Sequence, residues 1–268
     1  MLRRILFPMD MSPFSKEALL WLSKRALQRQ SDLLVVHVVS PAAGLNTPHL
    51  VQETEVALNE FCQKNLPEEL FYKVIVATGD PLEIIPEYAS KEKCTFAVIP
   101  IQEDEEIAPL VKQLAIPQLI LRPRNGHFPE GDIYNNITVA IDLSPERTDM
   151  MLSELRDILQ QVDTVPSITL VHGIPLEDAE DSQTLLNAAE GALEIVAQEV
   201  STWNPNTSIH IVSGQPEIEL TQWIEETAPS LLVVGLSTQR EMWQLILGTT
   251  AEALIEGTTC PVLVFPTA

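Results

Sequence analysis

The chain has 268 residues, 45% hydrophobic and 20% charged, which is typical of a folded protein with room for two domains of about 130 residues. Its net charge of −22 repels phosphates and anionic lipid, so we expect no nucleic-acid or membrane partner. Apolar runs are far shorter than the roughly 20 residues of a membrane span, and no secretion signal is expected. Three cysteines without disulfide or metal-binding spacing favour a reduced cytoplasmic chain with buried thiols.

The first half of the chain alternates short β-branched runs with segments of helical length. This alternation is typical of β-α-β units around a parallel sheet. Ser12 and Pro13 predict the start of the first helix, with serine as the N-cap and proline at the first helical position. The expected strands are 4–8, 32–39, 72–77, 95–100 and 117–121.

A segment rich in proline, glycine and asparagine, residues 122–135, predicts a linker between a first domain, 1–124, and a second, 135–268. In the second domain Ser144 and Pro145 predict a helix start of the same kind. Continuous runs of Val, Ile and Leu predict strands buried on both faces, and therefore a doubly wound sheet of five parallel strands in each α/β domain. The expected strands are 136–141, 166–171, 207–212, 230–235 and 261–265.

The two halves repeat one pattern. Asp10-Met-Ser-Pro13 corresponds to Asp142-Leu-Ser-Pro145 at an offset of 132 residues, and three later matches follow at an offset of 135. Four matches in order indicate a duplicated domain. The later pairs are Leu33–His37 with Ile168–His172, Val76–Pro81 with Ile211–Pro216, and Phe96–Pro100 with Leu231–Gly235.

Several polar residues allow a structural and a functional interpretation. His37 and His172 occupy equivalent strand positions, which favours packed, hydrogen-bonded histidines over a catalytic pair. Ser144 has no G-x-S-x-G context and is needed as a cap, so we expect no hydrolytic triad and no enzyme. Asp142 and Gly235 lie at carboxyl ends of strands, where such sheets hold ligands. Each either contacts a ligand or serves only the local turn.

Four motifs follow one another in the sequence: Asp at the end of the first strand, Gly-x-Pro before the third helix, Leu-Leu-Val-Val-Gly235 followed by Leu247-Gly-Thr249, and Cys260-Pro-Val-Leu-Val-Phe265. Together they resemble the universal stress protein family. The resemblance covers both halves. It implies an adenine nucleotide alpha hydrolase-like fold in tandem, a non-catalytic role in the stress response, and ATP or a related adenylate, with Mg²⁺, as the ligand of the second domain.

Nucleotide-binding members of that family carry Gly-x2-Gly-x9-Gly-Ser/Thr after the fourth strand. Gly235 and Gly248 keep this spacing, but Thr238 replaces the middle glycine, and threonine tolerates a positive φ poorly. By this resemblance the ligand contacts divide into three groups. Asp142 lies beside the adenosine, Val234 and Gly235 lie under the ribose and α-phosphate, and Gly248, Thr249 and Thr250 surround the outer phosphates.

The first domain lacks most of this loop. Pro100 and Pro117 are 17 positions apart, whereas the matching Gly235 and Pro261 are 26 apart. The residues that remain, Gln102–Glu106, are acidic and repel phosphate. We therefore expect nucleotide binding, if the protein has it, in the second domain only.

Two functions remain open from the sequence. In the first, an adenylate in the second domain regulates contacts with a protein partner, which the sequence does not identify. In the second, both nucleotide sites have decayed and the chain is a ligand-free interaction scaffold. The resemblance also implies an intrachain pseudo-dimer in which Gln118–Leu121 pairs with Val262–Phe265, covering two sheet edges, and it leaves a higher oligomer open.

Overall fold

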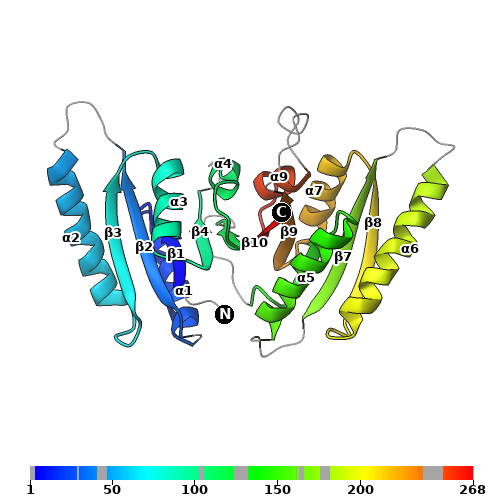
Figure 1. Ribbon diagram of the computed structural model, residues 1–268, viewed down its shortest axis with the longest axis horizontal. Coiled ribbons are helices and arrows are strands. Elements are labelled where there is room, and N and C mark those ends of the chain that lie inside the picture. Colours follow the sequence, from blue (N-terminus) through cyan, green and yellow to red (C-terminus); the bar gives the residue numbers. More distant parts are fainter. Residues whose placement is uncertain are drawn as a thin grey trace. The chain divides into compact units, whose positions relative to one another are not determined.

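The structure is a computed structural model that divides into two compact units, Met1–Phe128 and Pro129–Ala268 (Figure 1). The boundaries 1–124 and 135–268 and the pairing of the two last strands stay predictions. None of the described helices is long and apolar enough to cross a membrane. The residues described are 4–28, 30–40, 47–102, 106–123, 132–160, 162, 166–175, 182–237 and 250–267.

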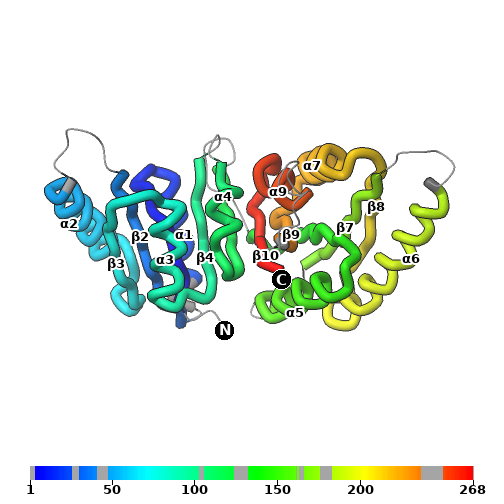
Figure 2. Tube along the Cα trace, turned by 45° about the horizontal axis from the view of Figure 1, so that its top comes forward, coloured from blue at the N-terminus to red at the C-terminus, as the bar shows by residue number. Residues whose placement is uncertain are grey.

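The first unit is a parallel sheet in the order β3-β2-β1-β4-β5. The chain winds from β1 toward β3 and then crosses back to β4, so right-handed crossovers place helices on both faces. Figure 2 shows α2 beside the edge strand β3, against which it packs. In chain order the elements are β1 (Arg4–Pro8), α1 (Pro13–Gln28), β2 (Asp32–Val39), α2 (Thr47–Asn65), β3 (Tyr72–Thr78), α3 (Pro81–Lys91), β4 (Phe96–Pro100), α4 (Ala108–Val111) and β5 (Gln118–Leu121).

The second unit repeats this topology as β10-β9-β6-β7-β8, again parallel throughout. Its α6 packs beside the edge strand β8 as α2 packs beside β3 (Figure 2). In chain order the elements are β6 (Asn136–Ala140), α5 (Pro145–Leu159), β7 (Ser167–Pro175), α6 (Ser182–Ser201), β8 (Thr207–Gly214), α7 (Pro216–Thr227), β9 (Leu231–Ser237), α9 (Thr250–Gly257) and β10 (Val262–Thr267).

The central strands form the core of each unit. Leu6, Leu34 and Val98 in the first unit, and Val139 and Val233 in the second, are at most 1% exposed. Because helices cover both faces, every residue of these strands can be apolar, and the sequence shows unbroken Val, Ile and Leu runs. The predicted doubly wound α/β fold, present twice, is confirmed.

Three local features depart from the predictions. β7 continues to Pro175 and β9 to Ser237, so Gly235 lies inside a strand rather than at its end. Ser144 is the N-cap residue of α5, but its side chain makes no capping hydrogen bond. In the first unit the capping bond exists, since the backbone N–H of Ser15 donates to Ser12 Oγ at 3.0 Å.

The Gly-x-Pro segments of the two halves form the turns before α3 and α7. Gly79 and Gly214 have φ of 147° and 140°, and Pro81 and Pro216 occupy the first turn of the next helix. Proline loses no hydrogen bond there because a helix's first N–H groups have no intrahelical partner. Asp80 caps α3 by accepting the Leu82 N–H at 2.9 Å.

The three cysteines are free and buried, as expected. Burial raises the pKa of Cys62 and Cys94 to about 11 and that of Cys260 to about 12, so thiolate, the reactive form, is scarce at neutral pH. We expect a disulfide reagent such as Ellman's to modify no thiol of the native chain at pH 8 and all three in guanidinium. Fast native labelling of any cysteine would contradict this burial.

Candidate functional site

A pocket of about 230 Å³ in the second unit lies at the carboxyl ends of its central strands. It lies where the strand order reverses between β6 and β9, the position at which doubly wound sheets hold ligands. The first turns of α7 and α9 complete it. Its lining is Ala140, Ile141, Asp142, His172, Gly173, Pro216, Leu220, Val234, Gly235, Thr250, Ala251 and Leu254.

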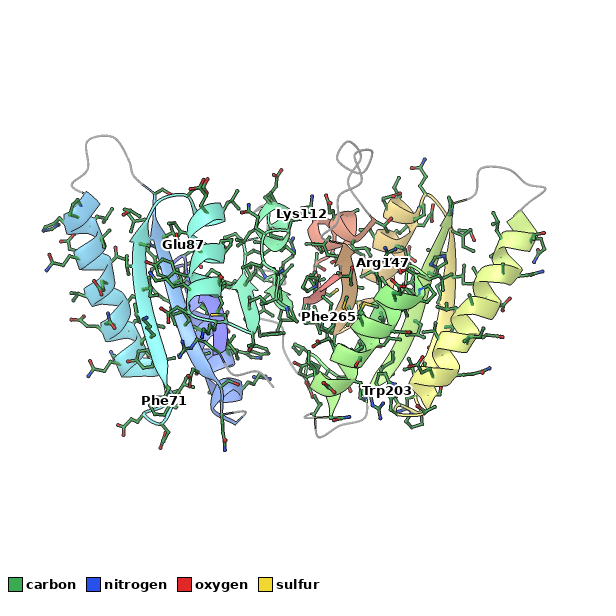
Figure 3. The ribbon with its side chains drawn as sticks, viewed as in Figure 1. Phe71, Glu87, Lys112, Arg147, Trp203 and Phe265 are labelled. Atoms are coloured by element: carbon green, nitrogen blue, oxygen red, sulfur yellow. The ribbon has the colours of Figure 1, made fainter. Side chains whose placement is uncertain are left out.

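Asp142 is held on both carboxylate oxygens. Its Oδ1 accepts the Ser144 N–H at 2.9 Å, and its Oδ2 pairs with Arg147 Nε at 2.7 Å. Arg147 lies in the first turn of α5 and is labelled in Figure 3. This ion pair was not among the expectations from the sequence, although an arginine at the third position of a helix that starts after Asp-x-Ser is a signal for it.

The residue after each aspartate is strained. Met11 and Leu143, at equivalent positions, have φ of 67° and 59°, a region costly for side chains larger than glycine. Each precedes a serine whose N–H donates to the preceding aspartate, at 2.9 Å from Ser12 to Asp10 and from Ser144 to Asp142. The aspartate side chain thus holds the strained loop closed in both units, which gives it a structural role beside any ligand contact.

The two histidines make equivalent hydrogen bonds. His172 Nδ1 donates to the Ile141 carbonyl at 2.6 Å, and His37 Nδ1 donates to the Met9 carbonyl at 2.5 Å. A carbonyl only accepts, so in both rings Nδ1 carries the proton of this hydrogen bond. The expected hydrogen-bonded histidines are confirmed, and both rings line the pockets of their units.

Gly235 is a strand residue with close neighbours. It lies opposite Phe265 of β10, and a Cβ on it would lie 3.3 Å from Thr267 Cγ2 and 3.6 Å from Met151 Sδ. Close packing on the sheet explains the glycine without any need for a positive φ. Gly235 also lines the pocket, so the structural and the binding interpretation both stand.

The other predicted nucleotide contacts divide into two groups. Val234 is 1% exposed beneath the pocket, and Thr250 begins α9 with its hydroxyl donating to Glu217 Oε1 at 3.2 Å. The structure thus brings Asp142, Val234, Gly235 and Thr250 together around one pocket. Thr238, Gly248 and Thr249 lie outside the described residues.

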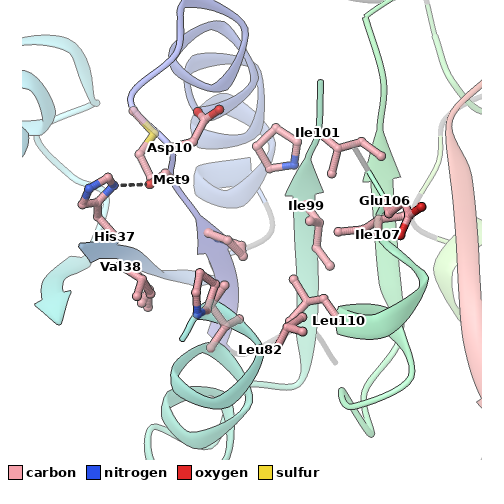
Figure 4. Close-up of a pocket in the computed structure, with 15 residues that line it drawn as sticks. Met9, Asp10, His37, Val38, Leu82, Ile99, Ile101, Glu106, Ile107 and Leu110 are labelled. Carbon is pink, nitrogen blue, oxygen red and sulfur yellow. Dashed lines mark hydrogen bonds between the residues drawn. The ribbon is translucent and has the colours of Figure 1, made fainter. Parts of the chain in front are cut away.

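The first unit has an equivalent, larger pocket of about 370 Å³ (Figure 4). Asp10 lies where Asp142 lies, but its Oδ2 accepts a hydrogen bond from Gln102 Nε2 at 3.2 Å in place of an ion pair. Burial raises the pKa of Asp10, yet hydrogen bonds from the Ser12 backbone and from the Ser12, Gln102 and Ser15 side chains outweigh it, and the net shift is downward. Asp10 is therefore a carboxylate at neutral pH.

Comparisons with known proteins identify the family and the fold. The chain matches the universal stress protein family over residues 1–104 and 133–266. A universal stress protein of Methanocaldococcus jannaschii is 28% identical over 94 residues, 34% of this chain and 55% of that protein, so the match spans about half of that relative.

Solved structures show the same fold. A universal stress protein from Archaeoglobus fulgidus superposes with a TM-score of 0.69 at 18% identity, covering 99% of this chain and 96% of its own. A protein described as a universal stress protein from Pseudomonas aeruginosa gives 0.67 at 18% identity, covering 99% and 93%. With two family segments that together span most of its length, the chain belongs to the universal stress protein family and carries its domain twice.

Proposed function

We propose that the second unit binds ATP or a related adenylate, and that occupancy of this site regulates contacts with a protein partner. The observation that carries the proposal is the pocket at the β6–β9 switch point, which combines an apolar floor with a helix N-terminus. Leu220 and Leu254 supply apolar surface for a base. The first turn of α9, at Thr250 and Ala251, offers backbone N–H groups that suit phosphate.

The charge around the pocket supports this assignment. The second half of the chain has a net charge of −17 and three arginines as its only fixed cations, a field that opposes a nucleotide. Arg147 neutralises Asp142 by the 2.7 Å ion pair, which lowers that repulsion at the pocket itself. Mg²⁺, where bound with the phosphates, would offset further negative charge.

A role without catalysis fits the described residues. Nδ1 of His172 is engaged by the Ile141 carbonyl, and the nearby Ser144 makes no hydrogen bond to this ring in the described part of the chain. A hydroxyl nucleophile needs a base within hydrogen-bond reach. The pocket is therefore suited to holding a ligand, and we propose binding as its activity.

The alternative is a ligand-free scaffold that acts only through its surfaces. The paired carboxylate of Asp142 favours it, because Arg147 and Ser144 already satisfy both oxygens. The replacement of the middle motif glycine by Thr238 favours it as well.

A native mass spectrum of the freshly purified chain tests the proposal. We expect a species heavier than the bare 29.8 kDa chain by the mass of one adenylate, which acid release followed by chromatography then identifies. Spectra that contain only the bare chain, before and after incubation with millimolar Mg·ATP and AMP, would favour the scaffold.

A further inference from the structure

The pocket of the first unit has the size and lining of a small-molecule site. Its volume of about 370 Å³ falls within the range of roughly 300–1,000 Å³ that ligand pockets occupy. Figure 4 shows Val38 on one side and Ile101, Ile107 and Leu110 on the other, with Leu82 of α3 below. Most of the wall is thus aliphatic, and it comes from five different elements or their flanking loops.

This pocket is poorly suited to a phosphate. No lysine or arginine is among its described lining residues. Pro8 and Pro100 end β1 and β4 where the second unit has Ala140 and Gly235. Proline has no N–H, so these two strand ends cannot donate to an anion.

Two carboxylates lie in the lining instead. Asp10 accepts from neutral donors, the Ser12 N–H at 2.9 Å and Gln102 Nε2 at 3.2 Å, whereas its counterpart Asp142 has a guanidinium. The reason lies in the sequence, because the position equivalent to Arg147 is Ser15, a neutral residue whose hydroxyl lies 3.2 Å from Met9 Sδ and also interacts with Asp10. Glu106 is exposed at the pocket edge. Within the described part of the chain, neither carboxylate has a cationic partner.

We propose that the pocket of the first unit binds a small apolar molecule that carries a protonated amine. The apolar body contacts the aliphatic wall, where removing water from both surfaces supplies the affinity. The ammonium group hydrogen-bonds to Asp10 and is attracted by the charge of Glu106. A charge-assisted hydrogen bond from an ammonium group to Asp10 is stronger than the present one from the neutral Gln102 amide. Together with the adenylate proposed for the second unit, this would give the two units of one chain ligands of opposite charge.

Three probes with one phenylbutyl body test the ligand class: 4-phenylbutylamine, 4-phenylbutanol and 4-phenylbutyrate. The full chain is labelled at its isoleucine methyl groups, and each probe is titrated in low-salt buffer near pH 7. The amine is expected to shift the methyl signals of Ile85, Ile99, Ile101 and Ile107, which line the pocket. The signals of Ile158 and Ile224, in the second unit, should not move. The alcohol should bind at least fivefold more weakly, and the acid more weakly still.

Variants of the two carboxylates locate the charge. Glu106→Gln changes an exposed residue and should weaken amine binding about threefold to fivefold. This loss corresponds to the free energy that a partly exposed ion pair contributes. Asp10→Asn should do the same, with a thermal melt to establish that the chain is folded. Glu87→Gln removes the same charge from the outer side of α3, away from the pocket lining, and should leave affinity unchanged. Val38→Phe adds bulk to the pocket wall and should abolish binding.

Three results would overturn the proposal: no methyl shifts with the amine, equal affinity for amine and acid, or equal losses in Glu106→Gln and Glu87→Gln. The inference is independent of nucleotide binding, since no residue of the second unit takes part. Saturating Mg·ATP should therefore leave the amine affinity unchanged, and either site can fail its test while the other passes.

Discussion

Calorimetric titration of the chain with Mg·ATP is expected to give one bound nucleotide per chain, held by the second unit. The first unit lacks nine residues of the segment after its fourth strand, and its pocket combines Asp10 and Glu106 with no lysine or arginine among the described lining residues. The second unit keeps the spacing from Gly235 to Gly248 and a pocket beside the start of α9. Because its net charge is strongly negative, binding should be weak and should need magnesium.

Two substitutions in the loop should move this affinity in opposite directions. Gly248→Val places bulk where the motif brings backbone to phosphate and should weaken binding more than tenfold, a loss above about 1.4 kcal/mol. Thr238→Gly restores the motif and should tighten binding severalfold, because glycine adopts a positive φ without strain. Gly191→Ala, at an exposed position of α6 where a Cβ meets no atom within 4 Å, is the matched control and should bind as the unmodified chain does.

Two nucleotides per chain would contradict the predicted asymmetry, since the first unit would then bind phosphate despite its acidic pocket. Tight binding that Gly248→Val does not change would show that the loop is not the phosphate site. An absence of heat with Mg·ATP, ADP and AMP alike would leave the scaffold function in place.

The positions of the strands were predictable from the sequence for a physical reason. A central parallel strand is buried on both faces, so its sequence is an unbroken apolar run such as Leu33–Val36 or Leu231–Val234. The duplication also repeated the patterns of the first four strands in the second half at a nearly constant offset, so each of these strands was predicted twice. Strands β1 and β2 have the predicted bounds, and the others differ mainly at their ends.

Side-chain pairing was not predictable in the same way. The ion pair between Asp142 and Arg147 depends on the strained backbone at Leu143, which sets the direction in which α5 leaves the loop. No periodicity in the sequence encodes that angle. Gly235 was interpreted either as a ligand contact or as a turn residue, since glycine permits a positive φ. The structure shows it in an extended strand, where its small size allows the close approach of Thr267 and Met151.

The first unit's pocket shows a related limit. Counting residues between Pro100 and Pro117 revealed a shortened loop, from which we expected an absence of nucleotide. The sequence could not show that Ile107 and Leu110, around the short helix α4, still wall a cavity against His37 and Val38. The volume of this cavity depends on the distance between the helices and strands around it. That distance is set by how these elements pack against one another and is not encoded in any one segment.

A pair of glycine-to-alanine substitutions should change stability in opposite directions. Gly214 ends β8 with φ of 140°, a conformation that side chains rarely adopt, and an added Cβ would lie 2.8 Å from Glu219 Cγ. Gly214→Ala should therefore lower the free energy of unfolding by about 1–3 kcal/mol. Most of this loss comes from the backbone, because the flexible Glu219 side chain can move aside.

Gly191 presents the opposite case, since it lies in the interior of the helix α6 with open space around its Cα. Alanine favours helix over glycine, mainly by restricting the unfolded chain, so Gly191→Ala should raise the free energy of unfolding by about 0.5–1 kcal/mol. Urea unfolding followed by circular dichroism measures both changes as shifts of the midpoint at constant slope. A stabilised Gly214→Ala chain would show that the turn before α7 does not require a residue with a positive φ. A destabilised Gly191→Ala chain would mean that other atoms pack against this face of α6. The two substitutions add the same methyl group to the same unit. The difference between their effects on the free energy of unfolding, about 1.5–4 kcal/mol, therefore reports mainly the effect of backbone conformation and not the burial of one carbon atom.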